Sequence, residues 1–79
     1  MPARKLSNIS LEQYRFFLGK AGCRCTRRKG GHEHWTRADL NRPITLSSHI
    51  DTVAEFIIKN GLRILNLNKA DFVKILFIE

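Results

Sequence analysis

The apolar and polar positions of residues 10–21 follow the period of an α-helix. Ser10 precedes this stretch and Gln13 stands at its third helical position, which is the form of a capping box. Gly22 follows as a typical helix stop. The pattern predicts a first helix over residues 10–21, preceded by a flexible basic lead over residues 1–9. The expected buried face is Leu11, Tyr14, Phe17, Leu18 and Ala21.

Residues 23–47 change to a period of two, which predicts three short strands. A first strand over residues 23–28 leads through the turn Lys29-Gly30-Gly31 into a second strand over residues 32–37. A third strand covers residues 43–47, where Pro43 at the first position need not donate to the ladder. Short connections favour an antiparallel meander. On the second strand, one face is expected to carry His32, His34 and Thr36, and the other Glu33, Trp35 and Arg37.

The helical period returns after residue 50. Asp51 or Thr52 can cap a helix that runs to about Leu65, with the pattern in register across Gly61 at a cost of about 1 kcal/mol for that glycine. A second cap signal at residues 68–71 predicts a short last helix that docks on the core. The expected apolar stripe of the longer helix is Val53, Phe56, Ile57, Asn60 and Ile64, with Ala54, Ile58 and Leu65 beside it.

The predicted order is helix, three strands, helix and short helix, within one domain over residues 1–79. This is an α+β fold in which helices cover one face of a three-stranded antiparallel sheet and leave the other face to solvent. The α-β-β-β-α order is that of the double-stranded-RNA-binding domain, a fold that reads RNA shape and backbone. The order alone does not supply a function.

The positive charge of the chain is concentrated in its first half. The formal net charge is +7. Residues 1–42 carry ten Lys or Arg against three acidic residues, whereas residues 43–79 carry four of each. The excess in one half favours nucleic acid or an acidic partner. No apolar run resembles a signal peptide or a membrane span. Two cysteines one residue apart are a poor disulfide framework, so we expect a reducing, cytoplasmic setting.

Candidate chemistry gathers in residues 27–35. His32 can transfer a proton near neutral pH, although spacing alone favours an ordinary residue beside a turn. His34 faces the same way and is a candidate second group, while His49 lies too far along the sequence to be assigned a position. Trp35, on the opposite face, is expected in the core. The candidate phosphate-binding residues are Arg27, Arg28, Lys29, Gly30 and Gly31.

A metal site is an alternative interpretation of the same strands. Cys23, Cys25, His32 and His34 would lie on neighbouring strands facing one way, and zinc binds two Cys and two His in many small domains. The usual spacings are two to four residues between the cysteines and three to five between the histidines, and neither occurs here. We therefore expect no metal and no cofactor.

The segment Lys29-Gly30-Gly31-His32, followed by His34 and Trp35, resembles the motif of HicA-type toxins of bacterial toxin–antitoxin modules, and the resemblance covers about residues 8–76. The family motif is Lys-Gly-(Ser/Gly)-His with an aromatic residue shortly after. Further segments similar to one subgroup are Arg42-Pro43-Ile44, His49-Ile50-Asp51 and Glu55-Phe56-Ile57-Ile58-Lys59-Asn60.

The resemblance implies a ribonuclease that cleaves mRNA, with His32 as its catalytic residue and a HicB-type antitoxin as inhibitory partner in a hetero-oligomer. Members of the family vary between Ser and Gly at the position of Gly31, so no hydroxyl is required there. Two functional classes remain open. One is a metal-independent endoribonuclease in the bacterial cytoplasm, and the other is a non-catalytic RNA-binding module that uses the same basic face.

Overall fold

The computed structural model describes residues 8–78, so residues 1–7 of the expected lead lie outside the described residues. The predicted α+β fold and its α-β-β-β-α order with a short C-terminal helix are confirmed. The elements are α1 (Leu11–Lys20), β1 (Arg24–Lys29), β2 (His32–Thr36), β3 (Ile44–Ser47), α2 (Glu55–Leu65), α3 (Lys69–Val73) and the π-helical turn η1 (Lys74–Ile78). Within the described part, no helix is long and apolar enough to span a membrane.

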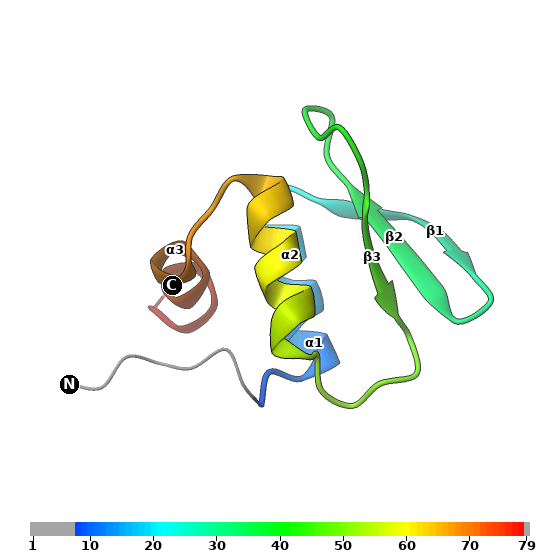
Figure 1. Ribbon diagram of the computed structural model, residues 1–79, viewed down its shortest axis with the longest axis horizontal. Helices are drawn as coiled ribbons and strands as arrows, with labels where there is room; N and C mark the ends of the chain where they lie inside the picture. Colours follow the sequence, from blue (N-terminus) through cyan, green and yellow to red (C-terminus); the bar gives the residue numbers. More distant parts are fainter. Residues whose placement is uncertain (1–7, 79) are drawn as a thin grey trace.

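The sheet and α3 lie on opposite sides of α1 and α2 (Figure 1). On the α3 side of the core, Phe17 of α1 meets Phe72 of α3 edge to face with ring centroids 4.6 Å apart. From the sheet side, Ile44 and Leu46 of β3 are buried against the same core. The interior is thus filled by side chains, and the outer face of the sheet is left to solvent.

Helix α1 begins and ends within one residue of the predicted bounds, with Ser10 as its N-cap and Ala21 as its C-cap. Gln13 donates its backbone N–H to Ser10 Oγ at 3.0 Å, and Ser10 donates its own to Gln13 Oε1 at 2.8 Å, which completes the capping box. Gly22 follows the helix with φ of 91°, a conformation that other residues rarely adopt. The residues of the predicted face that are buried are Leu11, Tyr14, Phe17 and Leu18.

Strands β1, β2 and β3 form an antiparallel meander with β2 in the centre. The β1–β2 hairpin closes through Gly30 and Gly31, with φ of 60° and 80°. Positive φ at both central residues matches the twist of the flanking strands. The register shifts between Cys25 and Arg27, so β1 contains a bulge at this point.

Helix α2 starts later than predicted, at Glu55 with Ala54 as N-cap and no side-chain cap bond. The cap prediction on Asp51 or Thr52 is wrong because that segment pairs with residues 9–11, where the chain enters α1. Leu11 donates its backbone N–H to the Asp51 carbonyl at 3.1 Å. Val53 donates to the carbonyl of Ile9, a buried residue of the expected flexible lead, at 2.8 Å.

The buried face of α2 also differs from the expected stripe. Gly61 does lie inside the helix, as predicted. The face of α2 that meets the core is centred on the buried side chains of Ile58 and Leu62, whereas Phe56 is 67% exposed and Asn60 is exposed. The reason is the close contact at Gly61, where the missing side chain makes room for the Tyr14 hydroxyl of α1. The full buried set is Ile58, Gly61, Leu62 and Leu65.

Candidate functional site

His32 is the first residue of the central strand, directly after the glycine turn, and its side chain is exposed. Its backbone lies opposite Lys29 of β1 and Ser47 of β3. Directly paired residues of an antiparallel sheet carry their side chains on the same face, about 5 Å apart. An imidazole, an ammonium group and a hydroxyl therefore share one end of the outer sheet face.

The next row of the outer face repeats this composition. His34 lies opposite Arg27 and Thr45, and its Nδ1 is 3.3 Å from Thr45 Oγ1. At the far end of β1, Arg24 lies opposite Thr36. The outer face is thus a band of cations and hydroxyl groups on either side of the two histidines, on β1 and β3 respectively.

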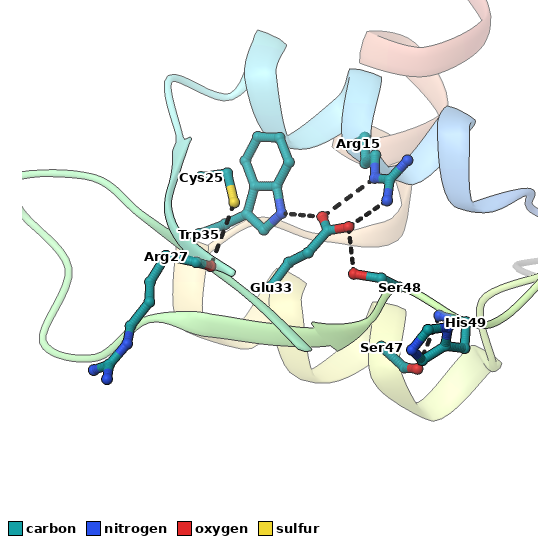
Figure 2. A network of polar contacts seen from close by, with 8 residues as sticks. All are labelled: Arg15, Cys25, Arg27, Glu33, Trp35, Ser47, Ser48 and His49. Atoms are coloured by element: carbon teal, nitrogen blue, oxygen red, sulfur yellow. Dashed lines mark hydrogen bonds and ion pairs between the residues drawn. The ribbon is translucent and has the colours of Figure 1, made fainter. Parts of the chain in front are cut away.

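The three adjacent cations do not all join this face. Arg28 lies opposite Glu33, whose side chain points into the protein, so the backbone pairing assigns Arg28 to the inner face. Figure 2 shows Arg27 pointing away from the Glu33 carboxylate, on the opposite side of the sheet. Of the residues predicted to bind phosphate, Arg27 and Lys29 therefore share a face with His32, while Arg28 is exposed at the rim of the other face.

Beneath His32, β2 carries a fully buried carboxylate, that of Glu33. Arg15 of α1 donates to it through Nε at 3.2 Å and forms an ion pair through Nη2. Trp35 Nε1 donates at 3.0 Å and Ser48 Oγ at 2.8 Å. These contacts, drawn in Figure 2, lower the pKa of Glu33 to about 2, with the Arg15 hydrogen bonds as the largest cause and burial opposing them.

This network fixes the position of β2. It joins the central strand to α1 through Arg15 and to the segment after β3 through Ser48. The sequence pattern put Glu33 and Trp35 together on the inner face, and both lie there, with Trp35 half-buried against the core. The pattern did not identify the partners of Glu33, because Arg15 is 18 residues away and Ser48 is 15 residues away.

His49 is the residue that sequence patterns did not connect with the site. Ser48 donates its backbone N–H to the Gly31 carbonyl at 2.7 Å, and His49 donates its own to Ser47 Oγ at 3.2 Å. The exposed His49 ring occupies the space beside Gly31, so that a Cβ on this glycine would overlap the ring. The fold thus brings a second exposed imidazole to the residue before His32.

The alternative metal site does not assemble. Because of the bulge in β1, Cys25 lies opposite Trp35 on the inner face, and Arg27 takes the place opposite His34. The prediction that the cysteine and histidine pairs face one way is therefore wrong. Among the described residues, no group of three or more His, Cys, Asp or Glu side chains is arranged to hold a metal ion.

No protein-family model, curated protein or solved structure matches the chain. The class that the fold and the site define is a small α+β domain with histidines and cations on an open sheet face.

Proposed function

We propose that this chain is a metal-independent endoribonuclease, similar to HicA-type toxins, that cleaves mRNA with His32 as its catalytic residue. The observation that carries the proposal is the exposed imidazole of His32 at a glycine turn. His32 is paired with Lys29, and Arg27 lies on the same face, in the pair with His34. Exposure matters because a polymer substrate reaches only groups on the surface of so small a domain. A ring packed in the core would have no access to RNA.

RNA carries its own nucleophile, since the 2′-OH can attack the adjacent phosphorus. The reaction needs a base for the 2′ proton, cations for the charge on phosphorus and an acid for the 5′-oxygen. His32 can take or give one of these protons, a contribution of about 10² to 10⁴ in rate. Arg27 can grip phosphate with two donors and Lys29 acts as a point charge. Gly30, which has open space around its Cα, lets the RNA backbone come close.

The predicted partners follow from the same surface. The band of cations on the outer face suits mRNA phosphates, and it equally suits an acidic antitoxin. A HicB-type antitoxin that covers His32 would block the site directly, in a complex of the two proteins in the bacterial cytoplasm. Its binding surface is expected to be acidic or groove-shaped.

The decisive experiment compares the wild type with His32→Ala on RNA in the presence of a chelator. The variant should lose cleavage by at least about 100-fold and lose toxicity on expression, while its fold and RNA affinity are kept. Two cations provide a matched pair, since Arg27→Gln should weaken RNA binding more than Arg28→Gln does. Equal cleavage by the wild type and the His32 variant would exclude His32 as the catalytic group.

A non-catalytic RNA-binding module is the second candidate. It is favoured by the element order shared with the double-stranded-RNA-binding domain and by an outer face whose cations can hold phosphate without any reaction. This candidate is the correct one if the wild type binds RNA tightly but does not cleave it. Steep loss of binding with salt is expected of both candidates and separates neither.

A further inference from the structure

Two imidazoles from separate segments lie beside the hairpin turn. His32 belongs to β2, whereas His49 follows β3 and lies against the Gly31 backbone. Seventeen positions separate them in the sequence, so only the fold brings them together. Both side chains are exposed, and the turn between them consists of glycines without side chains.

The segment that carries His49 is attached on both sides of His32. Ser48 donates its backbone N–H to the carbonyl of Gly31, the residue before His32, at 2.7 Å. Ser48 also donates its hydroxyl to the carboxylate of Glu33, the residue after His32, at 2.8 Å. Because Glu33 is buried and held by Arg15, this attachment is anchored in the interior of the protein. The backbone segments that carry the two histidines are thus held next to each other by these bonds.

We infer that His49 is the second proton-transfer residue of the ribonuclease reaction, acting with His32 on one phosphodiester laid across the glycine turn. This inference rests on the proposed function. One imidazole takes the 2′ proton as O2′ bonds to phosphorus. The other, as imidazolium, gives its proton to the 5′-oxygen as the P–O5′ bond breaks. The products are a 2′,3′-cyclic phosphate and a 5′-hydroxyl, and exchange of one proton with water restores the starting forms.

His34 is less suited to this task than His49. It extends from the same strand and the same face as His32, and its Nδ1 lies 3.3 Å from Thr45 Oγ1. In-line cleavage requires the base near O2′ and the acid near O5′, on opposite sides of phosphorus. Groups from two different segments meet this requirement more easily than two parallel side chains of one strand.

The test is single-turnover cleavage of RNA by the wild type and by the variants His49→Ala, His32→Ala and His34→Ala. Circular dichroism and thermal unfolding check the fold, and binding to a 2′-O-methyl RNA, which cannot be cleaved, checks affinity. The variant His49→Gln keeps bulk beside Gly31 and serves if the alanine variant does not fold. We expect the His49 variant to lose at least about 100-fold in rate with affinity kept, and the His34 variant to lose much less.

A second substrate separates proton transfer from positioning. In RNA with sulfur in place of the scissile 5′-oxygen, the leaving thiolate needs no proton. We expect one of the two variants, His49→Ala or His32→Ala, to recover rate on this substrate and the other to stay slow. Recovery of neither would overturn the inference, because a positioning role slows both substrates alike.

The remaining outcomes are also distinct. If the wild type cleaves and the His49 variant stays within about threefold of it, the inference is wrong while the proposed function stands. A large loss in the His34 variant with none in the His49 variant leads to the same conclusion. If the wild type never cleaves RNA, both are wrong together.

Discussion

Glu33→Gln tests how much the buried carboxylate stabilises the fold. The pKa of Glu33 falls from 4.5 to about 2 on folding. Each pKa unit corresponds to about 1.4 kcal/mol, so the ionised group contributes about 3 kcal/mol at neutral pH. Glutamine keeps the shape of the side chain and one acceptor oxygen. The Arg15 side chain is 32% exposed, so water can solvate its charge and reduces the cost of losing the carboxylate partner. We expect the variant to lose about 2–3 kcal/mol of unfolding free energy.

The loss should depend on pH in one direction. A carboxyl group whose pKa is lowered in the folded state stabilises the protein above its unfolded pKa, and this contribution disappears as pH falls through the folded value. For Glu33 the window runs from about pH 5 down to about pH 2, given a shift from 4.5 to about 2. The difference between wild type and Glu33→Gln should therefore be full at pH 7, about half at pH 3 and nearly absent at pH 2.

The assay is urea unfolding of both proteins at several pH values, followed by circular dichroism. The matched control is Glu55→Gln, since Glu55 is exposed at the start of α2 and its ion pair with Lys59, at 3.3 Å, lies on the surface. That change should cost no more than about 0.5 kcal/mol at any pH. The reasoning is refuted if Glu33→Gln is as stable as the wild type at pH 7, or if its loss is the same at pH 7 and pH 2.

Two further predictions concern glycines. Gly61→Ala should destabilise the wild type by about 1–3 kcal/mol, because the new methyl group overlaps the Tyr14 hydroxyl. In a Tyr14→Phe background the same change should stabilise the protein by up to about 1 kcal/mol, because alanine has the higher helix propensity. A double-mutant cycle of thermal unfolding measures this reversal. Gly31→Ala should cost clearly more than Gly30→Ala, because both need positive φ but only Gly31 meets the His49 ring. Equal unfolding free energies for these two variants would contradict the position of His49.

Local signals in the sequence were enough for α1. Ser10 and Gln13 are three residues apart, and their reciprocal bonds depend on no distant part of the chain. The glycine turn was predicted for the same reason, since Gly30 and Gly31 permit positive φ where other residues are strained. Residue type and spacing therefore sufficed wherever the partners were neighbours in the chain.

Long-range pairing was beyond the reach of the pattern. Asp51 and Thr52 are good cap residues, but their segment pairs with residues 9–11, and the helix begins at Glu55 instead. A single extra residue in β1 turned Cys25 to the inner face, which no period-two pattern can foresee. Both errors arose where tertiary contacts override local preference.

The candidate site also combines residues placed by local structure with residues placed by long-range contacts. The exposure of His32 and its neighbour Lys29 follow from the hairpin, which the sequence encodes locally. His49 could not be assigned to it, because Ser48 makes the link by a backbone bond to Gly31 that leaves no trace in residue type. Glu33 itself carries a signal for an internal ion pair, because an acidic residue on the inner face of a sheet requires a cation or hydrogen-bond donors beside it.

Strand β1 has a neighbouring strand on one side only within the described chain, so the backbone groups along its outer border are open to a second copy of the protein. Such borders invite pairing between molecules and aggregation. Arg24, Arg27, Arg28 and Lys29 lie along this strand, and we expect repulsion between their charges to keep two copies apart. Any polyanion that neutralises them would also remove this protection, so preparations at high concentration should stay clear in moderate salt and turn turbid when substoichiometric RNA is added.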